Sequence, residues 1–330
     1  MNESNGTCYE PNTTKNSHQV EFLFLVINTL LCVIGLGTNL FIGIAFYKNR
    51  AALKTPSNRL VFSLLISDTL SGINVMAQIT ISLKFKHIIV VRIFDDIITA
   101  FLAYNVVLHL CGITLDRFIA VYFALKYKKI VTLTFITRYI KVAWLLSIFA
   151  SGIQLVWVYA DLKNEKGFYG RSDEERIKIT NIEKWYSFAI LLIFLLFPMM
   201  FLGLALSAMF YEIRKILLKT KLLIIEKPCC VKTKQLRVIY MFTCMYVCFF
   251  IFAMPYFTIR MVEDFQIWCA SQVILQIVYT LKSTPHFVNS ILYSFFNKKM
   301  KNNLKYLIKA CLKKAICSKE DLQKTNSLIY

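Results

Sequence analysis

Charged residues stand at three places in or beside long apolar stretches. Asp116 and Arg117 directly follow residues 97–115, which contain no Asp, Glu, Lys or Arg, and Asp68 and Lys282 each interrupt an otherwise uncharged run. A charge inside a membrane helix costs about 2.5–3.5 kcal/mol on insertion scales, so we expect these side chains to serve function. The buried carboxylate could share a cation or water. The amine could pair with an acid, contact an anionic ligand or form a Schiff base, and the acid–base pair could be an interfacial ion pair.

Enzymatic chemistry finds little support in the sequence. His109 and His286 are isolated, and no His/Glu metal cluster falls within a predicted helix. Isolated histidines are more often packed side chains than ligands. We therefore expect neither an enzyme nor a metal centre built from histidines.

Seven apolar stretches must position the charged residues. Of 330 residues, 57% are hydrophobic, whereas soluble chains average about 45–50%. Each stretch is long enough for the helix of about 20 residues that crosses a bilayer core, and lipid favours helices because they satisfy their own backbone hydrogen bonds. The sequence predicts an all-α membrane protein with seven transmembrane helices. The stretches are residues 22–47, 60–83, 97–115, 142–160, 185–211, 238–259 and 265–297.

Basic residues are distributed unevenly between the two sides of these spans. Of 39 Lys and Arg residues, 26 fall on one side and 11 on the other. The positive-inside rule then places the N-terminus outside and the C-terminus in the cytoplasm of a multi-pass plasma-membrane protein. The net charge of +20 is largely this asymmetry, and basic residues near the membrane attract anionic lipid. A nucleic-acid partner is not needed to explain it.

The chain divides into four segments on this reading. They are an extracellular tail (1–19), the seven-helix domain (20–297), an amphipathic eighth helix at the inner membrane interface (298–312) and a cytoplasmic tail (313–330). The extracellular tail holds three N-glycosylation triplets, which need an extracytoplasmic surface. They begin at Asn2, Asn5 and Asn12.

The interfacial helix is predicted from apolar residues at helical spacing, with lysines mostly elsewhere around the helix. Cys311 and Cys317 then lie near the membrane and are candidates for palmitoylation. Of the ten cysteines, Cys8 and Cys269 are the two predicted outside, where disulfides persist. They could form one bridge, although sequence cannot show the geometry that a disulfide requires.

Polar residues lie at similar depth in three of the spans. Asn39, Asp68 and Asn289 could share a water or cation cluster, or bond the helices to one another. Lys282 lies in the outer half of the last span, where a lysine can also snorkel to the interface. Its candidate acidic partners are Asp95 and Asp96.

Short motifs occur in order along the spans. They are "GTN" ending at Asn39, "SLLISD" ending at Asp68, Asp116-Arg117-Phe118, Trp144, Phe249 with Pro255-Tyr256, and "NSILYSFFN". Their order, depth and spacing resemble those of rhodopsin-like (class A) G-protein-coupled receptors over nearly the whole chain. Asp116-Arg117-Phe118 resembles the family's Asp-Arg-Tyr, and "NSILYSFFN" resembles Asn-Pro-x-x-Tyr followed by the interfacial helix.

The resemblance implies roles for these positions. Arg117 would be a switch arginine, held by Asp116 at rest and released to meet a heterotrimeric G protein. The sixth helix would move outward, hinged at Pro255 while Phe249 repacks. Asn39, Asp68 and Asn289 would line a pocket for water and a sodium ion. The other expected switch residues are Phe118, Leu125, Tyr211 and Tyr293.

Several departures mark a divergent member. Arg92 stands where the family has a cysteine, Ala253 replaces a tryptophan, and Ser290 replaces a proline. Pro198 and Tyr211 are farther apart than their counterparts. The sixth helix offers no acid near Gln235 to clasp Arg117, so the resting lock should be loose and basal activity raised.

The family's ligand pocket lies between helices three, five, six and seven. Thr99 stands where monoamine receptors have an aspartate, which argues against a standard monoamine, although Asp95 is one turn away. Arg260 and Lys282 favour a carboxylate, a phosphate or an acidic peptide. The residues expected to line the pocket are Thr99, Ala103, Tyr104, Tyr256, Phe257, Arg260, Tyr279 and Lys282.

The expected function is a receptor for an extracellular small molecule or peptide. A retinal-binding, opsin-like photoreceptor is an alternative, but Lys282 is one residue farther from Asn289 than the family's retinal lysine, which turns it about 100° around the helix. A seven-helix transporter or channel is a further alternative. Such proteins usually carry paired Gly- or Pro-interrupted helices, and this sequence has none.

Overall fold

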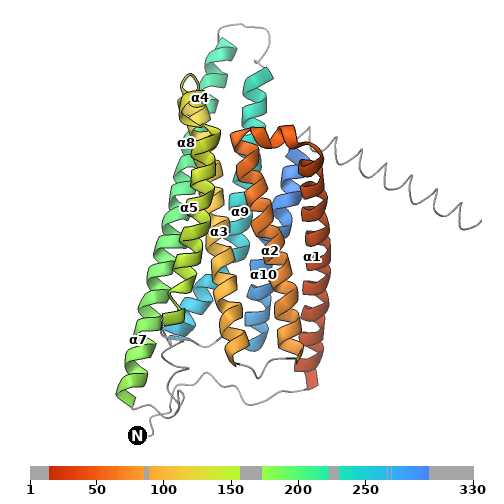
Figure 1. Ribbon diagram of the computed structural model, residues 1–330, viewed down its shortest axis with the longest axis vertical. Coiled ribbons are helices and arrows are strands. Elements are labelled where there is room, and N and C mark those ends of the chain that lie inside the picture. The colour runs from red at the N-terminus through yellow and green to blue at the C-terminus, as the bar shows by residue number, and fades with distance from the viewer. Residues whose placement is uncertain are drawn as a thin grey trace, which may run out of the picture.

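Long helices packed side by side form the described part of the chain, in which no strand occurs (Figure 1). The computed structural model describes residues 15–84, 89–156, 173–222, 230–265, 267–268 and 270–296. The long helices are α1 Lys15–Lys48, α2 Pro56–Lys84, α3 Ile89–Tyr122, α5 Leu133–Gly152, α7 Asp173–Ile190, α8 Phe197–Leu222, α9 Cys230–Asp264 and α10 Gln272–Phe296. Two short helices, η1 Arg50–Lys54 and α4 Tyr127–Ile130, lie at the end of the bundle that carries Arg117. We call this the inner end.

The fifth of the seven helices is built from three consecutive pieces. A π-helical segment, η3 Leu191–Leu196, joins α7 to α8 without a break. π-helical turns of this kind occur within longer α-helices, often at functional sites. Counting α7, η3 and α8 as one, the described residues contain the seven long helices that the sequence predicts.

Among the described residues, six helices have the length and apolar composition to cross a membrane. They contain residues 21–48, 56–81, 94–122, 133–152, 184–216 and 236–263. The seventh, α10, is not among them, although it packs against α1, α2 and α9. Its polar residues lower its hydropathy, but Ser283, His286, Asn289 and Ser290 are all buried inside the bundle.

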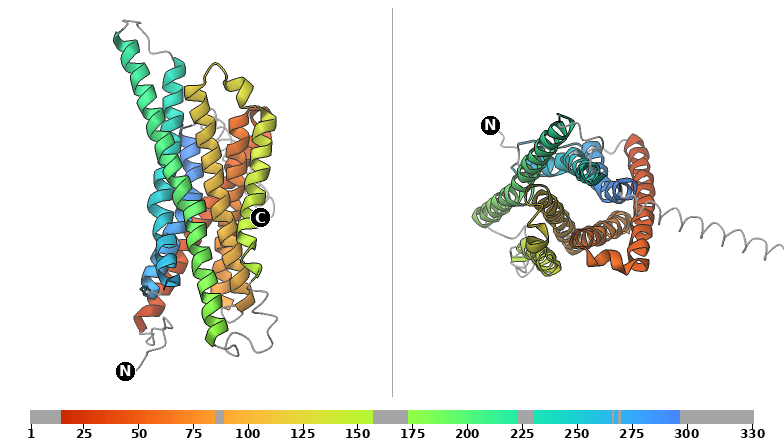
Figure 2. Two further views of the ribbon diagram at one scale, coloured as in Figure 1. Left: turned by 90° about the vertical axis from the view of Figure 1, so that its left-hand side faces the viewer. Right: turned by 90° about the horizontal axis from the view of Figure 1, so that it is seen from above.

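The long helices form a closed ring of which α3 is a member (Figure 2). Contacts link α1 to α2, α2 to α3, α3 to α8, α8 to α9, α9 to α10 and α10 back to α1, while α5 packs outside on α3. Because α3 also touches α9, one helix connects most of the bundle.

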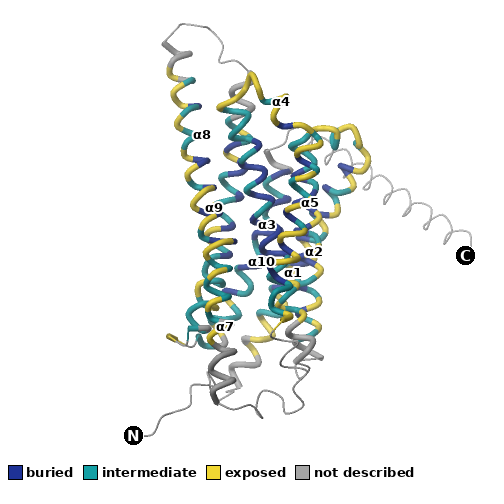
Figure 3. Tube along the Cα trace, turned by 60° about the vertical axis from the view of Figure 1, so that its left-hand side comes forward, coloured by how far each residue is buried: buried dark blue, intermediate teal, exposed yellow. Residues whose placement is uncertain are grey.

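Burial follows the helical repeat, as α1 illustrates (Figure 3). Its inward residues Cys32, Asn39 and Phe46 recur at the seven-residue spacing of one helix face and are at most 1% exposed. Its outward residues are large and apolar, among them Leu30 and Leu40. An apolar outer surface suits lipid rather than water.

Gly35 permits close packing between α1 and α10. A Cβ at this position would fall within the buried ring of Phe287, whereas a Cβ at Gly37 meets nothing within 4 Å. We expect Gly35→Ala to destabilise the purified protein by about 1–3 kcal/mol through overpacking. Gly37→Ala, the matched control two residues away, should be neutral or slightly stabilising because alanine favours helix. Thermal unfolding in detergent measures both, and equal melting temperatures would contradict the packing described here.

Candidate functional site

The inner end of α3 carries a buried hydrogen-bonded cluster around Asp116. Arg117 donates from Nε to Asp116 Oδ2 at 2.9 Å, and its Nη2 also contacts that oxygen and Ser57 Oγ. Ser57 Oγ in turn donates to Asp116 Oδ2 at 2.8 Å. The Asp116 side chain is 1% exposed and that of Arg117 is 20% exposed, so the pair is a shielded ion pair of the kind that is costly to break from one side.

Tyr127, at the start of α4, completes this cluster. Its hydroxyl donates to Asp116 Oδ1 at 2.7 Å. Burial raises the pKa of Tyr127, and its hydrogen bond to the Asp116 carboxylate adds to the rise. The hydroxyl therefore remains a donor at neutral pH. Neither Ser57 nor Tyr127 was predicted in this cluster, and Arg117 contacts Ser57 as well as Asp116.

The other expected switch residues are placed differently from one another. Phe118 stacks on Tyr122 with ring centroids 4.5 Å apart and packs against the cluster of Leu206, Met209, Ile213 and Ile239 that joins α8 to α9. Leu125 is fully exposed in the turn after α3. It is therefore available to a partner at the inner face.

Tyr293 is buried inside the helix bundle, whereas Tyr211 is exposed on its surface. Tyr293 is 4% exposed, stacks on Phe46 at 5.9 Å and donates to Asn58 Oδ1 at 3.3 Å. Tyr211 is 68% exposed on the outer face of α8. The position eight residues after Pro198, which is the family's usual spacing, is Leu206, and this residue is buried.

A polar network crosses the middle of the bundle around Asp68, which is 1% exposed. Asn289 Nδ2 donates to Asp68 Oδ2 at 3.2 Å, and His286 Nδ1 lies 3.0 Å from Asp68 Oδ1. Asn39 accepts a hydrogen bond from Ser290 and donates to the His286 carbonyl at 3.4 Å. The structure thus brings together the three predicted residues and adds two more from α10. His286 could have been found from its position one helical turn before Asn289, because this places both side chains on the same face of α10.

A second network ties α2, α3 and α5 through Trp144. Its Nε1 donates to Ser63 Oγ at 3.0 Å, and His109 Nε2 lies 2.7 Å from the same oxygen. His109 Nδ1 faces the Asn105 carbonyl at 2.7 Å, so it must carry the proton there and leave Nε2 to accept from Ser63. His109 is thus a satisfied core histidine, as its isolation in the sequence predicted.

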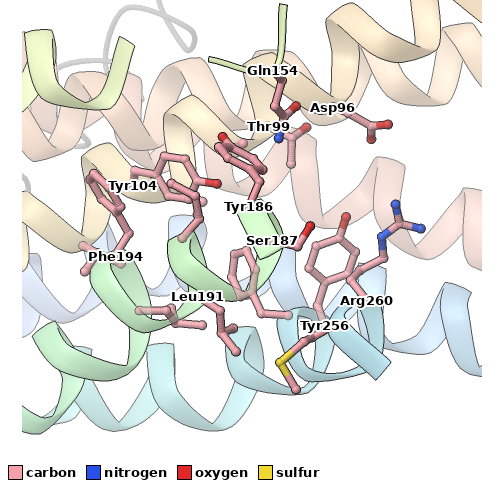
Figure 4. A pocket seen from close by; sticks show the side chains of 17 residues that line it. Asp96, Thr99, Tyr104, Gln154, Tyr186, Ser187, Leu191, Phe194, Tyr256 and Arg260 are labelled. Carbon is pink, nitrogen blue, oxygen red and sulfur yellow. The ribbon is translucent and has the colours of Figure 1, made fainter. Parts of the chain in front are cut away.

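A cavity of about 320 Å³ opens between α3, the α7–η3 segment and α9 (Figure 4). Aromatic side chains form much of its wall. Tyr104 lies against Phe194 at 4.8 Å between ring centroids, and Tyr186 donates to the Ala150 carbonyl at 2.7 Å. Asp96 and Arg260 stand at one end of it, opposite Phe194. The volume falls within the range of about 300–1,000 Å³ that is usual for ligand sites.

Six of the eight residues expected in the pocket line this cavity. They are Thr99, Ala103, Tyr104, Tyr256, Phe257 and Arg260. Gln154, Tyr186 and Ser187 also line it and were not anticipated, because they come from the turn after α5 and from α7. Tyr279 and Lys282 lie outside the cavity.

Lys282 lies outside the main cavity, against aromatic rings of α9 and α10. Its Nζ lies 4.1 Å from the ring centroid of Tyr256 and 4.3 Å from that of Tyr279. It lines a separate cavity of about 30 Å³, divided from the larger one by side chains such as Phe257 that border both. The residue is 7% exposed and Nζ has no hydrogen-bond partner in the described part of the chain, so it does not snorkel.

Replacing Lys282 with methionine should raise the melting temperature. The change removes a buried amine that lacks a hydrogen bond, and burying such a group costs about 1–3 kcal/mol. It also removes cation–π contacts, which stabilise the fold by about 0.5–2 kcal/mol. We expect a small net gain in the free energy of unfolding. Lys141→Met, on the exposed face of α5, is the control and should change little. A lower melting temperature for Lys282→Met alone would show that the lysine stabilises the fold.

Some predicted features lie outside the described residues. These are the glycosylation sites Asn2, Asn5 and Asn12, the cysteines Cys8 and Cys269, the interfacial helix 298–312, and Cys311 and Cys317. They remain predictions.

Comparison with known proteins agrees with this architecture. Residues 38–312 match the family described as 7 transmembrane receptor (rhodopsin family). Human trace amine-associated receptor 2 is 27% identical over 161 residues, covering 48% of this chain and 45% of that receptor. The chain thus spans less than half the length of this relative. The family match extends over most of the chain, from the first helix past the last described one, and confirms the seven-helix receptor fold. The chain belongs to the rhodopsin family of seven-transmembrane receptors.

Proposed function

We propose that this receptor binds an extracellular ligand in the 320 Å³ cavity and activates a heterotrimeric G protein at its inner end. One observation carries the proposal. The helix α3 contributes Thr99 and Ala103 to the cavity wall and, further along, Asp116 and Arg117 to the inner cluster. The ligand site and the arginine switch therefore lie on one continuous helix.

The helix α9 supplies the moving part. Near the cavity it carries Tyr256 and Phe257, and toward the inner end Ile239 packs into the apolar cluster with Phe118. Pro255 lies within α9 and removes one backbone hydrogen bond, which makes it a site for bending. A ligand that binds better when the inner end of α9 stands away from α8 would shift the population toward the active packing.

The cavity favours a small ligand with an aromatic or apolar body. Its wall combines rings such as Tyr104 and Phe194 with a few polar groups, among them Thr99 and Gln154. This arrangement is typical of small-molecule sites, where apolar walls supply affinity and a few polar groups fix orientation.

An amine is a second candidate ligand, held in a way unlike that of standard monoamines. The similar human receptor is named for trace amines, and Asp96 lines the cavity one helical turn from Thr99. A panel of biogenic amines tests this with a G-protein dissociation readout. Asp96→Asn should abolish any amine response while Asp95→Asn, which alters an acid outside the cavity wall, should retain it.

The opsin alternative is disfavoured by the position of Lys282. A retinal Schiff base needs the amine to open into a cavity long enough for the polyene, and the space beside Lys282 is about 30 Å³. Absorbance after adding retinal tests this directly. The transporter alternative is disfavoured by membership of a receptor family.

The proposed function is tested by screening a small-molecule and peptide library for G-protein dissociation in cells that express the receptor. A response that requires Arg117 supports it. Absence of any response across all G-protein classes, with the receptor at the cell surface, would count against it.

A further inference from the structure

The Asp68 carboxylate is where the family resemblance implies a sodium ion, so the fit of its surroundings to a cation can be tested. Hard cations are held by several oxygen ligands, from carboxylates, carbonyls, hydroxyls and water. A sodium site around Asp68 would therefore need one or both carboxylate oxygens and further oxygens turned toward them.

Both oxygens of Asp68 face nitrogen atoms instead. His286 Nδ1 lies 3.0 Å from Oδ1, and Asn289 Nδ2 lies 3.2 Å from Oδ2. At such a distance one proton must lie between Oδ1 and Nδ1, whichever of the two groups formally carries it. A cation would have to displace this proton and the asparagine amide.

The neighbouring polar side chains form hydrogen bonds with groups other than Asp68. Asn39 Oδ1 accepts from Ser290, Ser71 Oγ donates to the Ser67 carbonyl at 2.9 Å, and Ser67 Oγ donates to Asn105 Oδ1 at 2.5 Å. Asn289 Oδ1 is the one side-chain oxygen of this network without a partner among the described residues. A serine hydroxyl that donates its proton keeps lone pairs for a cation, whereas a proton already lies between each Asp68 oxygen and the nitrogen that faces it.

The small cavity beside this network is bordered by His286, whereas Asp68 is not among the residues that line it. Its polar lining offers oxygen as well as nitrogen atoms, from Ser71, Asn74, Gln78, Thr99, Ser283 and Lys282. His286 is therefore the side chain that both borders this cavity and contacts the Asp68 carboxylate.

We propose that the His286 side chain occupies the place of a sodium ion, so that the receptor does not bind sodium at Asp68. The imidazole supplies locally what an ion would supply, a positively polarised partner for a buried carboxylate that joins α2 to α10. Removing the ring should free Oδ1 and leave a polar space. His286→Ser, which adds a hydroxyl oxygen there, should then create sodium dependence in a receptor that lacks it.

The test uses the purified full-length receptor in detergent, without ligand or G protein, so its result is independent of the proposed signalling function. Melting temperatures are compared in sodium chloride and in N-methylglucamine chloride at equal ionic strength. The wild type should melt at the same temperature in both. An ion that binds only the folded state must raise the melting temperature with its concentration, so His286→Ser should melt higher in sodium. The double variant His286→Ser with Asp68→Asn should lose that difference.

Two results would overturn the proposal. The first is a sodium-dependent rise for the wild type that Asp68→Asn abolishes, which would mean that sodium binds despite His286. The second is a sodium-independent melting temperature in both His286→Ser and His286→Asn, which would mean that the histidine is not what excludes the ion. The asparagine variant also serves if the serine variant does not fold, because it keeps a polar side chain of intermediate size.

Discussion

Replacing Asp116 with asparagine should raise the basal rate of nucleotide exchange on the G protein by about ten-fold, which corresponds to a loss of about 1.4 kcal/mol of resting-state stabilisation. The carboxylate accepts hydrogen bonds from Arg117, Ser57 and Tyr127, and it is almost fully buried. Asparagine keeps the size and one acceptor oxygen but removes the charge that holds Arg117. The measurement is nucleotide exchange in membranes that contain matched amounts of receptor and no ligand.

Tyr127→Phe provides the graded control for Asp116→Asn. It removes one donor from the carboxylate, 2.7 Å away, and leaves the ion pair in place. A hydrogen bond to a charged group contributes about 1.5–3 kcal/mol at most, and the carboxylate keeps its other donors, so the rise in basal exchange should be smaller than for Asp116→Asn. Basal exchange that is unchanged in Asp116→Asn, with normal expression, would mean that Asp116 does not restrain the arginine.

Filling the 320 Å³ cavity with a larger side chain at position 103 should weaken the agonist response by about 100-fold or more, equivalent to about 2.8 kcal/mol of lost binding. Ala103 is 9% exposed and lines both the large and the small cavity. Leucine and then tryptophan at this position would occupy progressively more of the ligand space. The concentration of agonist that gives half-maximal G-protein dissociation should rise in that order.

Ala77→Trp is the matched control for this series. Ala77 is exposed on the outer face of α2, where added bulk meets lipid. Surface expression, measured with an N-terminal epitope, guards against a folding defect in either variant. Equal agonist potency in Ala103→Trp and wild type would place the ligand outside this cavity.

The helices could be predicted from the sequence because a long uncharged run in lipid must satisfy its own backbone hydrogen bonds, and a helix does so. The run 97–115 lies within α3, Ile89–Tyr122, and the run 185–211 lies within the α7–η3–α8 helix. Five of the helices extend past their uncharged runs at both ends, since charges mark the limits of the apolar layer and not the ends of hydrogen bonding. The helix α5, Leu133–Gly152, begins before its run of 142–160, so that Arg138 and Lys141 lie inside the helix, and it ends before the run does. The helix α10, Gln272–Phe296, begins after the start of its run, 265–297.

The inner cluster was predictable only in part. Asp116 and Arg117 are neighbours in the chain, so their pairing follows from local geometry. Ser57 lies in α2 and Tyr127 lies in α4. Both hydrogen-bond to the same carboxylate, and this depends on how α2 and α4 pack against α3. The spacing of Ser57 and Tyr127 in the sequence gives no information about that packing.

Helix rotation explains the remaining differences. Lys282 was expected in the ligand pocket, yet the rotation of α10 places it beside the small cavity instead. Tyr211 ends a run without charges, and such a run gives no polar face from which its rotation can be read. His286 was not predicted beside Asp68, although it precedes Asn289 by one helical turn and so lies on the same face of α10.

The most direct test of the arginine switch is nucleotide exchange measured side by side for the wild type, Asp116→Asn and the double variant Asp116→Asn with Arg117→Ala. If Asp116 restrains Arg117 and Arg117 engages the G protein, the single variant should exchange faster than the wild type, and the double variant should fall to the rate of membranes without receptor. A double variant that exchanges as fast as Asp116→Asn, at equal expression, would contradict the account.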